Sequence, residues 1–106
     1  MLFAKEEIKM PEVPAAFIHN FQARKILRHA VERFDFEEQV AIYLYCFLGL
    51  PISEIAESTK LSENSIVCIL TLYAERLSFK IDVFKKAIPY CADDLVPITE
   101  VLALES

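Results

Sequence analysis

Residues 49–70 have the sequence GLPISEIAESTKLSENSIVCIL, and this stretch decides the fold. Pro51 suits the start of a short helix, because its missing N–H would have no partner in a first helical turn. The helix is predicted to end in a turn that Leu61 closes by entering the core. Ser62 then caps a second helix by accepting a hydrogen bond from one of its free N–H groups. Ala56 is small, so the two helices can cross closely.

A further helix is predicted immediately before this stretch. Asp35, followed three residues later by Glu38, forms a capping pair at its start. Gly49 supplies the left-handed residue that ends it. The expected buried stripe of this helix comprises Phe36, Val40, Tyr43, Leu44, Phe47 and Leu48. The three helices together form the predicted core, which covers residues 35–78.

The helix that begins after Ser62 is predicted to be long, about 26 residues or roughly 39 Å. Its apolar residues recur at steps of three and four until Pro89 ends the pattern: Ile66, Leu70, Tyr73, Leu77, Ile81, Phe84 and Ile88. A second apolar line, almost opposite the first, comprises Leu72, Phe79 and Val83. A core of this size does not need so long a helix. We therefore expect the second line to be a packing seam for another molecule, with homodimerisation as the expected outcome.

The two ends of the chain complete the expected fold. Residues 1–13 form an extended lead-in, and residues 14–34 form a first helix that Pro14 opens. Residues 79–106 extend the long helix and then form a tail with a last short helix. The sequence therefore predicts a single all-α domain of about four helices, with a long fourth helix and a short C-terminal helix.

Composition excludes several classes of function. The chain has 106 residues, of which only Gly49 is glycine, so glycine-rich phosphate loops and a two-lobed enzyme are excluded. His19 and His29 point to different faces of their expected helix, and no set of catalytic or metal-ligating residues can be placed together. We therefore expect no enzyme activity, metal, cofactor or small-molecule substrate. Three isolated cysteines and the lack of a membrane-length apolar segment favour a cytoplasmic protein without a membrane partner.

The charges are unevenly distributed along the chain, whose net charge is −5. Residues 1–34 hold six basic and four acidic residues, whereas residues 35–106 hold five basic and twelve acidic residues. Arg24, Lys25 and Arg28 form the dense basic patch of the sequence. This patch is either a contact for nucleic acid or an acidic partner, or a solvated helix face.

The core pattern also resembles a known family. The matching residues are Gly49, Leu50, Glu54, Ile55, Ala56, Leu61, Ser62 and Ile66. With the preceding helix they make residues 35–78 similar to region 4 of bacterial sigma factors and to the related LuxR-like response regulators. The resemblance implies a helix-turn-helix unit whose second helix enters the major groove of DNA. The residues facing the groove would be Asn64, Ser65, Cys68 and Thr71, while Arg24 and Arg28 on the first helix would touch phosphate.

The expected DNA-reading helix departs from the family in its charge. In the family this stretch is rich in Lys and Arg, but residues 61–75 contain neither and include Glu63 and Glu75. Phosphate contacts supply most of the affinity for DNA, and Arg or Lys most often reads guanine. Two hypotheses follow. The first, which the resemblance favours, is a dimeric, DNA-binding regulator of transcription.

The second hypothesis is a helix-turn-helix scaffold used for protein interaction without DNA. Its partner would be a second copy, RNA polymerase or a sigma factor. The contact would be made by Leu72, Phe79 and Val83.

Overall fold

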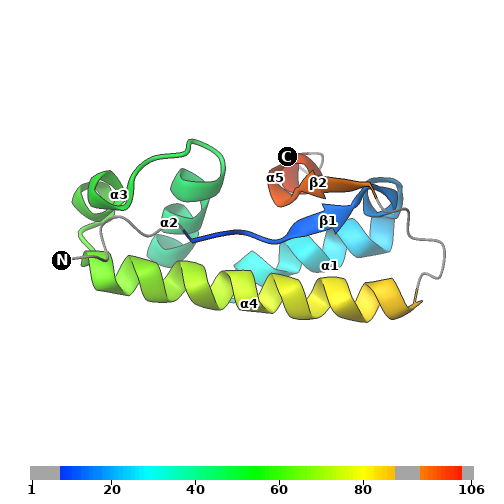
Figure 1. Ribbon diagram of the computed structural model, residues 1–106. Coiled ribbons are helices and arrows are strands. Elements are labelled where there is room, and N and C mark those ends of the chain that lie inside the picture. The colour runs from blue at the N-terminus through cyan, green and yellow to red at the C-terminus, as the bar shows by residue number, and fades with distance from the viewer. Residues whose placement is uncertain (1–7, 88–93, 104–106) are drawn as a thin grey trace.

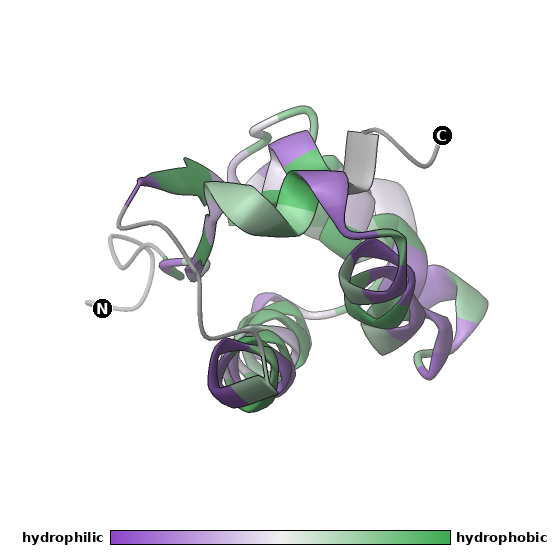
Figure 2. Ribbon diagram, turned by 90° about the vertical axis from the view of Figure 1, so that its right-hand side faces the viewer, coloured by the Kyte–Doolittle hydropathy of each residue, from purple (hydrophilic) through white to green (hydrophobic). Residues whose placement is uncertain are grey.

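The computed structural model describes residues 8–87 and 94–103, and its architecture rests on one long helix. This helix, α4 (Glu63–Ala87), runs the length of the molecule (Figure 1). Seen along its axis, α4 lies at one edge of the molecule, beneath the other elements (Figure 2). The described part of the chain is mostly helical, which confirms the predicted all-α class.

The other elements form two groups along α4. Helices α2 (Phe36–Cys46) and α3 (Ile52–Thr59) pack on its N-terminal half. Helix α1 (Phe21–Glu32) lies beside its C-terminal half, where the N-terminal and C-terminal segments of the chain also meet (Figure 1). α4 is therefore the element that both groups share.

The predicted helix boundaries around the core agree with the structure. Asp35 and Glu38 form a capping box at the start of α2. Gly49 has a left-handed φ of 66°, although α2 itself ends slightly earlier, at Cys46. Between α3 and α4, Lys60 also has a left-handed φ, and the Ser62 Oγ accepts a hydrogen bond from the Ser65 N–H at 3.0 Å. Turn geometry and capping thus set where α4 begins.

The buried stripe of α4 is also as predicted. Ile66, Leu70, Tyr73 and Leu77 are fully buried, and Ile81 is 4% exposed. The helix continues through Ser78 to Ala87 without a break. Further along, the Phe84 ring packs edge to face on Phe17 from the N-terminal segment, with ring centroids 5.8 Å apart. The predicted stripe ends at Ile88 and Pro89, which lie outside the described residues.

The prediction of a single helix over residues 14–34 is wrong. Pro14 ends strand β1 (Glu12–Pro14), and a 3₁₀ helix, η2 (Ala15–His19), follows it. The chain is extended at Asn20, whose side-chain oxygen accepts a hydrogen bond from the Ala23 N–H at 2.9 Å. This cap starts α1 as a separate helix, because an N-cap residue has non-helical backbone angles.

A small sheet, which the sequence pattern did not predict, ties the two ends of the chain together. β1 pairs antiparallel with β2 (Leu95–Pro97), with Val13 opposite Val96. The predicted last short helix is present as α5 (Ile98–Ala103), and its Ile98 and Val101 are buried. The C-terminal segment therefore belongs to the core.

The predicted buried stripe of α2 is wrong for most of its residues, although Val40 and Leu44 are half-buried and Leu44 packs against the core. The residues that α2 buries are Ala41 and Ile42, which face α3 and α4. Phe36 is 78% exposed and Leu48 is 66% exposed, while Tyr43 and Phe47 are exposed and stack on each other. Because apolar residues occur on every side of α2, periodicity alone could not select its inner face.

Tyr73 places a polar group in the core without satisfying its capacity for hydrogen bonds. Its hydroxyl is buried and has no hydrogen-bond partner in the described part of the chain. A buried hydroxyl without a partner costs about 1–3 kcal/mol. We expect Tyr73→Phe to raise the free energy of unfolding by about 1 kcal/mol, or the melting temperature by about 4–8 °C. Thermal unfolding followed by circular dichroism measures this, and a lower melting temperature would mean that the hydroxyl has a stabilising partner.

Candidate interaction surface

The start of α4 presents the residues that the family resemblance assigns to DNA. Asn64, Ser65, Cys68 and Thr71 are all exposed on its first turns. The capping hydroxyl of Ser62 also lies 2.9 Å from the Ser65 hydroxyl, which ties one of these side chains to the cap. The structure thus brings the four residues together on one end of a capped helix.

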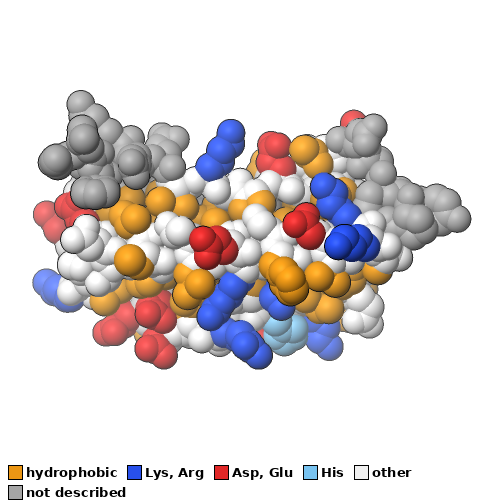
Figure 3. All heavy atoms as spheres, turned by 60° about the horizontal axis from the view of Figure 1, so that its bottom comes forward, with side chains coloured by type: hydrophobic (Ala, Val, Ile, Leu, Met, Phe, Trp, Pro, Cys, Tyr) orange, Lys and Arg blue, Asp and Glu red, His pale blue; other side chains and the backbone are white. Residues whose placement is uncertain are grey.

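The surroundings of these residues are not basic. Glu63 and Glu75 are exposed on the same helix. On the face in Figure 3, several acidic side chains and one basic side chain lie at the end that holds α3 and the start of α4, while most Lys and Arg lie near the middle and towards the other end, together with further acidic side chains. Arg76, the first basic residue of α4, lies over the Phe34 ring at 4.7 Å from its centroid. Its guanidinium is therefore directed towards the end of α1.

Arg24 and Arg28 lie on α1, apart from the start of α4. α1 runs beside the C-terminal half of α4, while Asn64 is in the first turn of α4 at the opposite end (Figure 1). The Arg24 guanidinium donates a hydrogen bond to the carbonyl of Ile18 and lies 5.9 Å from the Phe21 ring centroid. The structure therefore does not join the two groups of predicted DNA contacts into one surface.

The second apolar line on α4 is exposed, as its spacing predicted. Leu72 is 42%, Phe79 70% and Val83 50% exposed. We name these three residues the α4 apolar line. Large apolar side chains that share one side of a helix and lack cover are typical of a surface for a protein partner.

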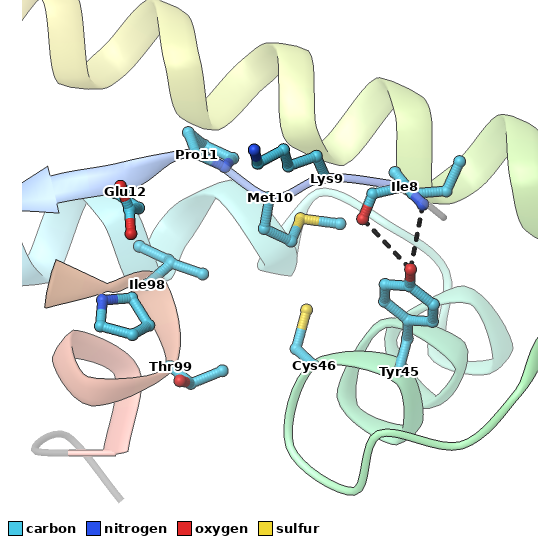
Figure 4. A pocket seen from close by; sticks show the side chains of 10 residues that line it. Ile8, Lys9, Met10, Pro11, Glu12, Tyr45, Cys46, Ile98 and Thr99 are labelled. Atoms are coloured by element: carbon cyan, nitrogen blue, oxygen red, sulfur yellow. Dashed lines mark hydrogen bonds between the residues drawn. The ribbon is translucent and has the colours of Figure 1, made fainter. Parts of the chain in front are cut away.

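Sequence reasoning missed a cavity between the two groups of elements (Figure 4). It has a volume of about 370 Å³, with walls from residues 8–12, the end of α2 and the start of α5. The Tyr45 hydroxyl accepts a hydrogen bond from the Ile8 N–H at 3.0 Å and donates one to the Ile8 carbonyl at 3.1 Å. These bonds hold the N-terminal segment as one wall of the cavity.

Cys46, the last residue of α2, lines this cavity with its thiol side chain. Its side chain and that of Met10 point towards each other in Figure 4. Burial raises the pKa of the Cys46 thiol from 9.0 to about 11. The thiolate is the nucleophilic form of cysteine, so Cys46 is a packing residue and a poor nucleophile at neutral pH.

Within residues 8–87 and 94–103, no three His, Cys, Asp or Glu side chains are grouped so that they could hold a metal ion. No helix in that part of the chain combines the length and apolar character needed to cross a bilayer. The chain matches no protein-family model, no curated protein and no solved structure. The surface of α4 and its neighbours therefore provides the evidence on function.

Proposed function

We propose that this chain is a helix-turn-helix protein of transcriptional type that acts through protein contacts made by α4, with a second copy of itself as the partner. The family resemblance of residues 35–78 supports the helix-turn-helix part. Helices α2, α3 and α4 pack on one another, and a tight turn with a left-handed residue at Lys60 joins the last two. These features are those expected of such a unit.

The observation that carries the protein-contact part is the contrast between two successive stretches of the exposed face of α4. The α4 apolar line is 42–70% exposed, whereas the predicted DNA-reading turns have Glu63 and Glu75 but no Lys or Arg. Burial of apolar side chains drives most protein association, while DNA binding depends on positive charge. The α4 apolar line therefore favours a protein partner over DNA.

Light scattering of the full chain over a range of concentrations tests this proposal. Self-association predicts a molar mass that rises towards twice the 12.2 kDa of the single chain. A mass of 12.2 kDa at every concentration would count against a second copy as the partner. In that case, binding of the chain to purified RNA polymerase or sigma factor would test the remaining form of the proposal.

DNA binding is the second candidate, because one observation favours it. Asn64, Ser65 and Thr71 form a polar, exposed group on the capped start of α4, where a DNA-reading helix would present its side chains. Asn can read adenine, and Ser or Thr can contact phosphate. Selection from random duplex DNA at low salt tests this candidate. Enrichment of a motif that Asn64→Ala abolishes would support it, and no enrichment would reject it.

A further inference from the structure

A second hollow lies beside the α4 apolar line and has the chemistry of an anion receptor. Its volume is about 270 Å³, and it lies between the end of α1, the start of α2 and α4. Its lining comprises Arg33, Phe34, Glu38, Cys68, Ile69, Leu72 and Arg76. We name it the Arg76 pocket. Leu72 belongs both to this pocket and to the α4 apolar line, so the two features form one continuous surface.

Arg76 is held in this pocket with unused hydrogen-bonding capacity. Its guanidinium lies over the Phe34 ring at 4.7 Å, and Phe34 in turn packs edge to face on Tyr73 with centroids 6.1 Å apart. The Nη1 atom of Arg76 is buried and has no hydrogen-bond partner in the described residues. Because Arg76 also lines the pocket, the positive charge of its guanidinium attracts an anion that enters there.

The charges that line the pocket specify the acceptor as an anion. Arg33 and Arg76 contribute two positive charges, against the single carboxylate of Glu38. One Glu38 oxygen already accepts a hydrogen bond from the Asp35 N–H at 3.0 Å, as part of the cap of α2. The planar fork of a guanidinium matches a carboxylate, which can accept two parallel hydrogen bonds. A cationic group would be repelled by the net positive charge, and a neutral acceptor would lack the charge attraction that a carboxylate gains.

We propose that the Arg76 pocket binds the carboxylate of an Asp or Glu side chain from the protein that covers the α4 apolar line. This inference rests on the proposed protein-binding function of α4. A carboxylate is favoured over a nucleic-acid phosphate because the pocket shares Leu72 with an apolar surface. Contact surfaces of proteins combine apolar anchors with paired charges in this way, whereas nucleic-acid surfaces are extended and basic. The partner thus presents an acidic residue next to an apolar one.

Cys68 gives direct access to this pocket, because it is exposed and also lines it. In the full chain with Cys46→Ala and Cys91→Ser, disulfide exchange at Cys68 with small thiols can be brought to equilibrium and measured by mass spectrometry. The probes are 3-mercaptopropionate, cysteamine and propanethiol, which carry a negative, a positive and no charge. We expect 3-mercaptopropionate to be captured about tenfold more than either of the others, which is the effect of one charge-assisted hydrogen bond.

Variants assign the preference to the pocket. Arg76→Gln should bring the capture ratio close to one, and Arg33→Gln, at an exposed position, should reduce it without affecting the fold. Lys85→Gln removes the same charge from an exposed position of α4 outside the pocket and should leave the ratio unchanged. Equal capture of the three thiols by the unsubstituted pocket would overturn the inference. So would protection of Cys68 by a short DNA duplex, which would assign the pocket to phosphate.

The capture preference and the molar mass together distinguish a missing carboxylate site from a missing second copy. If the molar mass depends on concentration but the capture preference is absent, α4 is a protein-binding surface and the Arg76 pocket does not bind a carboxylate. A monomeric chain that retains the preference would keep the pocket as a carboxylate site and shift the partner to a different protein.

Discussion

The Phe79→Glu variant is expected to stay monomeric at concentrations where the natural chain associates. Phe79 is the most exposed residue of the α4 apolar line, at 70%, and lies between Leu72 and Val83 in sequence. Burying a Phe side chain contributes about 1.5–3 kcal/mol, and a buried carboxylate without a partner adds a further cost. A symmetric contact contains the substitution twice. Association should therefore weaken by about 100-fold to 10,000-fold, as measured by light scattering or sedimentation equilibrium.

Ser78→Glu is the matched control for this variant. Ser78 is exposed and does not belong to the α4 apolar line. It lies about 100° around the helix from Phe79. The same charge introduced there should leave association nearly unchanged. Both substitutions are at exposed positions, so the free energy of unfolding should change by less than about 0.5 kcal/mol in either variant. If the two variants associate equally well, the α4 apolar line is not the contact.

The Leu77→Ala variant is expected to lose a large part of the stability of the fold. Leu77 is fully buried on α4, in the stripe that contacts the rest of the core. Leu→Ala substitutions at such positions cost about 2–5 kcal/mol, because a cavity remains where the side chain was. The total free energy of unfolding of a domain of this size is about 5–15 kcal/mol. Urea unfolding measures the loss, and circular dichroism is the suitable signal because the chain has no Trp.

Leu72→Ala provides the comparison on the same helix with the same chemical change. Leu72 is 42% exposed, so it buries less area in the folded single chain. We expect this variant to lose less than about 1 kcal/mol when measured on dilute protein, where association does not contribute. Similar losses in the two variants would show that the assignment of inner and outer sides of α4 is incorrect.

The long helix and the helix boundaries of the core could be predicted because their signals are local. Asp35, Gly49 and Ser62 act within a few residues of themselves, and the stripe of α4 repeats often enough to define one face. The break at Asn20 also has a local signal, a capping residue, but an apolar pattern on both sides of it favours one continuous helix. The pairing of β1 with β2 joins segments far apart in sequence, and strands this short show no alternation.

The candidate site also has one feature that the local sequence predicts and others that depend on tertiary packing. Exposure of the α4 apolar line followed from its spacing, since Leu72 and Phe79 do not lie on the buried stripe of α4. The Arg76 pocket could not be predicted, because it depends on Phe34 from the end of α1 reaching the middle of α4. Likewise, the separation of Arg24 from Asn64 is set by where α1 packs. Only tertiary packing determines such distances between elements.

The continuity of α4 through Ser78 has a consequence for how the chain unfolds. One part of the helix packs with α2 and α3, while Phe84 near its other end contacts Phe17 from the N-terminal segment. Neither group can lose its partner surface without disrupting the helix that supports the other. The two groups therefore share one cooperative transition, and a fragment cut after Ser78 would keep the α2 and α3 contacts but lose the part of α4 that contacts Phe17.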